Sequence, residues 1–209
     1  MSKLVPVRKL RDSLALEDHA DLNAMVESAL RVATNAISSV LTTSFDRVTQ
    51  TDRFSLVDSP VLDLDQSVLT FKLSRGFVDT TQPITIKAAD VAADLATADA
   101  IVQDNVFVDA SRGYVTFMDL SVLDGKFLSI AYTAGFTTIP DNESKRYAQV
   151  PESLEQAALL AAAPIYEYEA ALKSKNKTTT IVKPPALPAL TRELLIPFMR
   201  VKGAVVLPI

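Results

Sequence analysis

Two stretches of this chain carry apolar residues at helical spacing, and alanine lines the middle of both. The first runs from about Asp18 to Leu41 and the second from Pro151 to about Lys173. In each stretch apolar residues recur three and four positions apart, which predicts an amphipathic helix. The central alanines are Ala29, Ala33 and Ala36 in the first and Ala157, Ala158 and Ala161 in the second. Because alanine lets two backbones approach closely, the two helices are predicted to pack against each other.

The sequence also predicts how these helices begin. Asp18 or Asp21 is expected to cap the first helix, because a carboxylate there accepts from free backbone N–H groups. Pro151 suits the first turn of the second helix, where its missing N–H costs nothing. Pro164 lies inside that helix and is expected to bend it. Residues 1–17 are predicted to be extended.

The chain between the helices, from Phe45 to Ala134, has the pattern of short β strands separated by turn-forming residues. The predicted strands are 48–56, 68–73, 84–88, 106–108, 114–118 and 127–132, with the fourth and fifth forming a hairpin. The stretch 88–100, rich in alanine and aspartate, is predicted to be a short helix or an exposed loop. The expected fold class is therefore α+β. It has two packed alanine-rich helices, with a small antiparallel β region inserted between them in the sequence. An extended C-terminal arm follows the second helix.

The chain beyond residue 172 differs from the rest in charge and composition. It has seven basic residues and one acidic residue, a net charge of +6, so the total of −4 leaves −10 for residues 1–172. A polar stretch leads into Pro184-Pro185, which is expected to be stiff and extended. A short helix is predicted within 190–197 and an unpaired strand at 204–207. We therefore expect a core, 1–172, and a proline-containing arm, 173–209.

The composition argues against most kinds of chemical site. The chain has no cysteine and a single histidine, His19, which excludes disulfides, thiol catalysis and a histidine-rich metal site within one chain. The acidic pairs Asp63/Asp65 and Asp90/Asp94 are interpreted as solvated surface residues, because nothing nearby in the sequence would shift a pKa. No uncharged apolar run reaches the roughly 18 residues of a membrane span. We expect no enzymatic activity, no cofactor, no metal and no membrane partner.

One segment resembles a known family. The predicted strand 127–132 ends in Thr133-Ala134-Gly135-Phe136, and Val150-Pro151 then opens the alanine-rich second helix. This order resembles the head–tail connector (adaptor) proteins of tailed bacteriophages. The residues that carry the resemblance are Tyr132, Gly135, Phe136, Val150, Pro151, Leu154 and Ala157. It covers most of 10–172, whereas the middle, 58–105, looks longer than the family's usual loop.

The resemblance implies a structural virion protein. Members of that family assemble, as dodecamers, into a ring beneath the portal and join it to the tail or to the next neck component. The implied partners are copies of the chain itself, the portal protein, a further neck or tail protein, and DNA that passes through without sequence-specific binding. The implied location is the virion neck, after synthesis in the host cytoplasm. An acidic body suits a DNA channel, because like charges keep the duplex mobile.

The arm is the expected portal-binding element, as connectors of this family commonly reach the portal through C-terminal segments. The candidate residues are Arg192, Leu194, Leu195, Ile196, Phe198, Met199, Arg200, Val205, Val206 and Leu207. Their apolar side chains would anchor the arm, and the cations would meet acidic groups on the portal. The alternative is that the arm folds back on its own subunit or onto the next one in the ring.

Two further hypotheses remain open from the sequence. Loops within 74–105 are expected to contact neighbouring subunits or to form the lower face of the ring. The alternative function is a small nucleic-acid-binding module that uses the basic tail 173–202. That tail offers only Phe198 for base stacking and has prolines where a recognition helix would be needed. The sequence does not indicate the tail type, the protein below the ring or the channel-lining residues.

Overall fold

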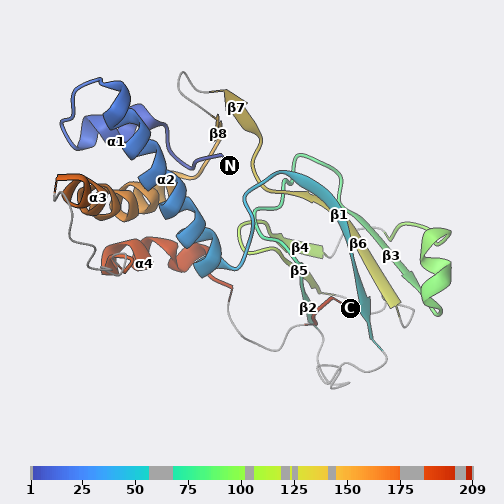
Figure 1. The fold of residues 1–209 in the computed structure, drawn as a ribbon. Coiled ribbons are helices and arrows are strands. Elements are labelled where there is room, and N and C mark those ends of the chain that lie inside the picture. Colours follow the sequence, from blue (N-terminus) through green and yellow to red (C-terminus); the bar gives the residue numbers. More distant parts are fainter. Residues whose placement is uncertain are drawn as a thin grey trace. The chain divides into compact units, whose positions relative to one another are not determined.

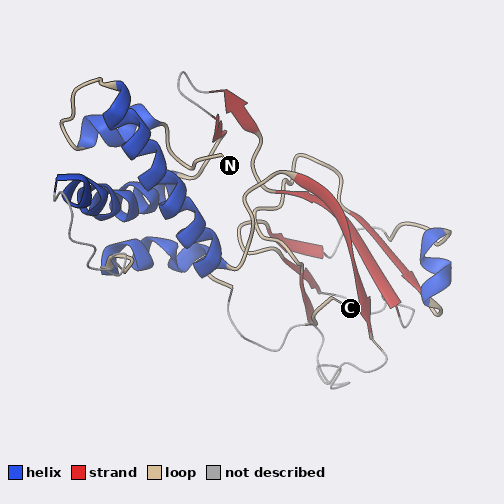
Figure 2. Cartoon of the chain, viewed as in Figure 1, coloured by secondary structure: helices blue, strands red, loops and turns tan. Residues whose placement is uncertain are grey.

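The structure, a computed structural model, is an α+β fold (Figures 1 and 2). It describes residues 2–56, 68–101, 106–118, 123, 127–140, 145–174, 186–200 and 206–208. The chain divides into two compact units: a helical unit, 1–42 and 136–199, and a β unit, 43–135 and 200–209. The expected division into a core and an arm at residue 172 does not coincide with the boundaries of these units. Residues 173–199 of the arm belong to the helical unit and residues 200–209 to the β unit.

The described residues of the helical unit form four α-helices. They are α1 (Val7–Ser13), α2 (Ala20–Leu41), α3 (Glu152–Ser174) and α4 (Ala189–Leu195), the last followed by the 3-10 helix η3 (Ile196–Phe198). A small hairpin joins β7 (Thr138–Pro140) to β8 (Lys145–Tyr147). Helix α3 packs against both α2 and α4, while α1 lies on α2. The bounds of α2 and α3 agree with the predicted helices to within two residues.

The pairing of the two long helices is confirmed, and small residues occupy it. Ala29 and Ala33 of α2 are fully buried, as are Ala157, Ala158 and Ala161 of α3, whereas Ala36 is half-buried. Across the pair, the Ser28 hydroxyl donates to Glu169 Oε1 at 3.2 Å. Each helix therefore buries a flat face, as expected for closely packed helices.

The β unit consists of two antiparallel sheets of three strands. One has the order β1 (Val48–Ser55), β6 (Phe127–Ala134), β3 (Thr85–Ala89); the other has the order β2 (Leu69–Lys72), β5 (Tyr114–Phe117), β4 (Val106–Asp109). All six strands lie where the sequence predicted them, and β4 and β5 form the predicted hairpin. The stretch 88–100 contains a short 3-10 helix, η1 (Ala92–Ala96).

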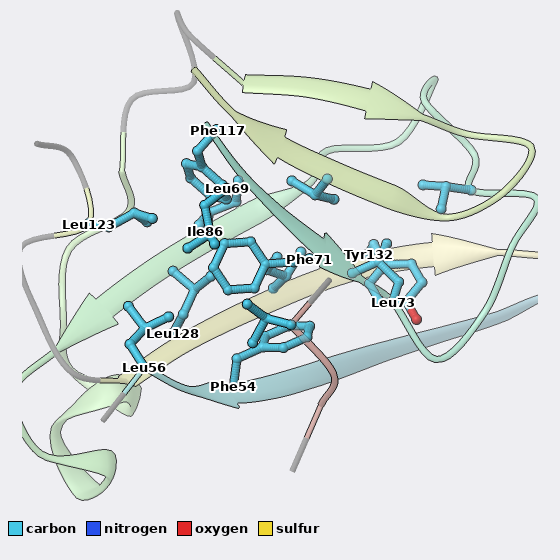
Figure 3. Packing of buried hydrophobic residues seen from close by; sticks show 14 of the residues in the cluster. Phe54, Leu56, Leu69, Phe71, Leu73, Ile86, Phe117, Leu123, Leu128 and Tyr132 are labelled. Atoms are coloured by element: carbon cyan, nitrogen blue, oxygen red, sulfur yellow. The ribbon is translucent and has the colours of Figure 1, made fainter. Parts of the chain in front are cut away.

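Large side chains from both sheets fill the core of the β unit. In Figure 3, Phe54 of β1, Phe71 of β2 and Phe117 of β5 point toward one another. Their rings meet edge to face, with centroids 5.0 Å apart for Phe54–Phe71 and 5.4 Å for Phe71–Phe117. Such pairs are favourable beyond the area that they bury. Leu128 and Ile130 of the central strand β6 complete this layer.

Several local predictions are wrong. Residues 1–17 are not all extended, because α1 forms there, with Arg11 bonded to Asp18 Oδ1 at 2.5 Å. Asp18 is therefore bound to Arg11 and does not cap α2. The N-cap of α2 is His19, whose Nδ1 accepts from the Asp21 N–H at 3.4 Å. Helix α3 continues through Pro164, and the bend expected there stays a prediction. Within the described chain, no helix has the length and apolar character needed to cross a membrane.

Candidate assembly site

The family-like segment begins at a buried polar network around Tyr132. The Tyr132 side chain is only 1% exposed, and its hydroxyl donates to Asp52 Oδ2 at 2.8 Å. The same hydroxyl accepts from Gln50 Nε2 at 2.6 Å and from the Arg75 N–H at 3.2 Å. Asp52 also accepts from both the N–H and the hydroxyl of Ser74, each at 2.6 Å. The network therefore ties β1 and β6 to the chain that follows β2.

This network keeps the Tyr132 phenol protonated. Burial, and next the hydrogen bond to the Asp52 carboxylate, raise the pKa of Tyr132 well above its ordinary value. A phenol held neutral in this way serves as a donor and not as a base. Among the described residues, no group of three or more acidic or histidine side chains could hold a metal ion. The Tyr132 hydroxyl thus links β1, β6 and the chain after β2 through hydrogen bonds.

Gly135 provides the turn at the end of β6. Its φ is +88°, and a Cβ there would lie 2.3 Å from the Asp46 carbonyl oxygen, so a larger residue would clash with backbone. The Gly135 N–H donates to the Phe77 carbonyl at 2.8 Å. Gly135 is the last residue of this β-unit segment, and Phe136 begins the next segment of the helical unit. There the Phe136 ring lies 6.2 Å from the Tyr147 ring, centroid to centroid.

The other family-like residues open α3. The Pro151 carbonyl accepts from the N–H of Leu154 at 2.9 Å and from that of Glu155 at 3.0 Å. Leu154 and Ala157 are fully buried, and Val150 and Pro151 are half-buried. The seven residues thus lie in two groups, with Tyr132 and Gly135 in the β unit and the other five in the helical unit.

The C-terminal arm buries part of its apolar surface in its own chain. Leu195 and Phe198 are buried in the helical unit, where α4 packs on α3, and Leu194 and Met199 are half-buried. Three of the predicted portal-binding residues are exposed, namely Arg192, Ile196 at 57% and Leu207 at 58%. Val205 lies outside the described residues.

Arg200 binds backbone of the β unit. Its Nε donates to the Arg112 carbonyl at 2.8 Å and its Nη1 to the Ser74 carbonyl at 3.1 Å, while its Nη2 donates to the Leu73 carbonyl. Burial lowers the pKa of the Arg200 guanidinium from its ordinary value. Three carbonyl acceptors compensate for the lost hydration, so Arg200 fastens the chain after η3 to the β unit.

Val206 pairs with the edge of the second sheet. Its N–H donates to the Thr70 carbonyl at 3.0 Å, and its carbonyl accepts from the Lys72 N–H at 2.9 Å, which forms a parallel bridge to Phe71. The side chain is buried in the aromatic core. The expectation of an unpaired strand at 204–207 is therefore wrong for Val206. The alternative, in which the arm folds back on its own subunit, describes four of these residues: Leu195, Phe198, Arg200 and Val206.

Sequence reasoning missed the Asp52–Tyr132 network and the role of Arg200. One signal for the network was present, since Asp52 is a charged residue at an inward-facing position of a predicted strand. Arg200 gave no such signal, because a guanidinium that binds backbone carbonyls leaves no pattern in the sequence.

Comparisons with known proteins give similarity only among solved structures. No protein-family model matches the chain, and no curated protein matches it significantly. The chain is similar to one in the neck of an empty gene transfer agent (GTA) particle computed with C6 symmetry, at 20% identity and a TM-score of 0.47. It is also similar to chains in the virion of a native GTA particle (20%, TM-score 0.46) and in a native GTA neck with C12 symmetry (20%, 0.41). The matches cover 95% of this chain and 90–91% of the others.

Proposed function

We propose that this chain is a non-enzymatic structural subunit of a virion neck, a head–tail connector that joins the capsid portal to the tail or to the next neck component. The supporting observation is the geometry of the family-like segment. Gly135 ends the central strand β6 in a turn that admits no side chain, and Val150-Pro151 then opens α3, which packs on α2 through alanine. Each residue of the sequence resemblance therefore has a defined structural task.

The proposed assembly is a closed ring, twelvefold as in the family. A head-to-tail interface whose rotation closes generates a ring from identical subunits. Purified protein, alone and mixed with its portal, would be measured by mass photometry and negative-stain microscopy. Rings with a central channel support the proposal, whereas a protein that stays monomeric in the presence of portal contradicts it.

The proposed ring conducts DNA without binding it. Residues 1–172 carry a net charge of −10, and like charges weaken contact with phosphates. The other candidate function, nucleic-acid binding through 173–202, is disfavoured by Arg200, whose guanidinium is committed to carbonyls of its own chain. Titration of duplex DNA at two salt concentrations separates the two functions. Tight binding that weakens steeply with salt would favour the nucleic-acid module.

Portal docking by the arm is proposed for its exposed residues. Leu195, Phe198 and Val206 are already buried in their own chain, so Arg192, Ile196 and Leu207 are the side chains available to a partner. Ile196→Ser and Leu207→Ser should each reduce co-purification with portal while leaving the melting temperature unchanged. Leu190→Ser is the matched control, because Leu190 is equally exposed on α4 but is not a predicted docking residue. Portal binding that survives both substitutions would contradict docking through these residues.

The segment 74–105 is proposed to contact neighbouring subunits. It contains the exposed short helix η1, and Val91, just before that helix, is 54% exposed. Deletion of residues 90–97 should leave the aromatic core intact but alter ring formation or tail joining. Normal assembly and tail joining by this variant would contradict the proposal.

A further inference from the structure

The sheet β1-β6-β3 carries a small polar pocket on the face that turns away from the aromatic core. Its volume is about 170 Å³. Strand β1 contributes Thr51 and Arg53, β6 contributes Ser129, β3 contributes Thr85 and Lys87, and Leu95 of η1 closes one side. All of these residues belong to the β unit. Helix η1 contacts both β3 and β6 and lies beside β3 in Figure 1. The lining residues place the pocket where this short helix meets the sheet.

The strand register brings two cations to either side of one hydroxyl. Arg53 is opposite Ser129, and Ser129 is opposite Lys87, so the three side chains form one row across the sheet. The neighbouring row is Thr51, Ala131 and Thr85. Side chains in such a row lie about 5 Å apart between adjacent strands. The small methyl group of Ala131 leaves space between the two threonine hydroxyls.

The pocket is lined by several hydrogen-bond donors. Ser129 is only 7% exposed, yet no described residue forms a hydrogen bond with its hydroxyl. Within the described chain, Arg53 likewise has no carboxylate partner, and no carboxylate lines the pocket. Lys87 Nζ donates to the Ala96 carbonyl at 3.1 Å, which holds it at the η1 side and leaves its other protons free to donate. Thr51 and Arg53 are exposed, so the donors of this pocket are accessible to an acceptor from solution.

We propose that this pocket binds a phosphate dianion, supplied as inorganic phosphate or as the terminal phosphate of a monoester. Two cations without a carboxylate give the lining a charge of +2, which a dianion neutralises. The Arg53 guanidinium can donate two parallel hydrogen bonds to adjacent oxygens, and the lysine and hydroxyl donors reach the others. A carboxylate offers one charge and two oxygens, so it would leave one cation and some hydroxyls unpaired. The volume admits a phosphate group, and the pocket is open to solvent, so the rest of a monoester can lie outside it.

Calorimetric and NMR titrations of the full-length protein test this site. Sodium phosphate at pH 7.5 should bind with one-to-one stoichiometry and shift the amide signals of Thr51, Thr85 and Ser129, whereas sodium acetate at the same ionic strength should not. Adenosine monophosphate is the second arm. Equal affinity for phosphate and adenosine monophosphate would mean that the site recognises the phosphate group alone. Tighter binding of the nucleotide would mean that its ligand is a phosphate monoester. Affinity for adenosine monophosphate should fall below about pH 6, where the monoester dianion gains a proton.

Two variants separate the site from general charge effects. Arg53→Gln should weaken phosphate binding about tenfold, because it removes a charge-assisted donor pair. Arg8→Gln removes the same charge from an 81% exposed side chain of α1 and should leave the affinity unchanged. Ser129→Ala keeps the net charge and should weaken binding several-fold. Equal binding of acetate and phosphate, or unchanged affinity in both Arg53→Gln and Ser129→Ala, would overturn the proposal. Ring assembly is measured separately, so either idea can fail alone.

Discussion

The helical unit and the β unit differ in the size of the side chains at one central contact of each. Alanines lie in the middle of the contact between α2 and α3, where Ala33 is fully buried. Between the two sheets, Phe54, Phe71 and Phe117 fill the space with aromatic rings. An alanine contact leaves no room for added atoms, whereas an aromatic layer leaves a cavity when atoms are removed. The two units should therefore respond oppositely to changes in side-chain volume.

The largest effect is expected from Phe71→Ala. Phe71 contacts both other rings of the aromatic layer, so its removal should destabilise the protein by about 3–5 kcal/mol. Urea denaturation measures this change in the free energy of unfolding. Phe107→Ala is the control, since Phe107 on β4 is 65% exposed and should cost less than about 0.5 kcal/mol. Similar losses in the two variants would show that the rings do not form a packed layer.

The second expected effect is overpacking in the helical unit. Ala33→Leu adds three carbons at a fully buried position of α2 and should cost about 2 kcal/mol. Ala24→Leu, at an exposed position of the same helix, should change stability by no more than about 0.5 kcal/mol. Both are measured by thermal denaturation. An unchanged melting temperature for Ala33→Leu would mean that α2 and α3 are not in close contact there.

A smaller effect is expected from Tyr132→Phe, which removes only a hydroxyl. The loss should be about 1.5 kcal/mol, because Asp52 keeps its donors from Ser74 and Gln50. The folded-state pKa of Tyr132 is raised, so its contribution is complete below pH 10 and is lost as the pH rises above 10, where the unfolded tyrosine ionises. Tyr132→Phe should therefore show a shallower decline in stability above pH 10 than the wild type. Identical alkaline profiles would rule out this linkage.

The smallest effect is expected at Asp79, near the surface of the β unit. Hydrogen bonds from Thr81, then the Arg47 guanidinium, lower the pKa of Asp79. Its contribution is therefore present above about pH 4 and is lost as the pH falls through the lowered value. Asp79→Asn should cost about 0.5 kcal/mol at pH 7 and less near pH 2, as measured by urea denaturation at both pH values. A larger loss at pH 2 than at pH 7 would contradict the assigned direction.

The elements that could be predicted are those whose pattern is local. The spacing of α2 and α3 and the alternation of β6 follow from side chains that are close in sequence, and these elements appear where expected. The hairpin β7–β8 was missed because its pairing depends on the distant N-terminus. There the Lys3 N–H donates to the Lys145 carbonyl at 3.2 Å, and the Tyr147 N–H donates to the Lys3 carbonyl at 2.8 Å. The sequence of 137–149 contains no pattern that predicts pairing with Lys3.

The residues of the candidate site can also be separated into those that a local sequence pattern predicts and those that it does not. Gly135 and Pro151 were identified because backbone geometry restricts the residue types at turns and helix starts. The positions of Leu195, Phe198 and Val206 in the arm could not be inferred, since an apolar side chain is equally suited to its own core or to a partner. Arg53 and Lys87 become neighbours only through the register of β3 and β1 on β6, which the sequence does not contain.

The chain passes between the two units at 42/43, 135/136 and 199/200, and this order has a consequence for folding during synthesis. Helix α2 leaves the ribosome roughly a hundred residues before α3, a delay of about 5–20 s at typical translation rates. During that interval the alanine face of α2 has no partner from its own chain. The β unit also waits, because Arg200 and Val206 are made long after β6. Neither unit can complete its core until residues near 200 have left the ribosome, so the nascent chain is expected to depend on chaperones that shield exposed apolar faces.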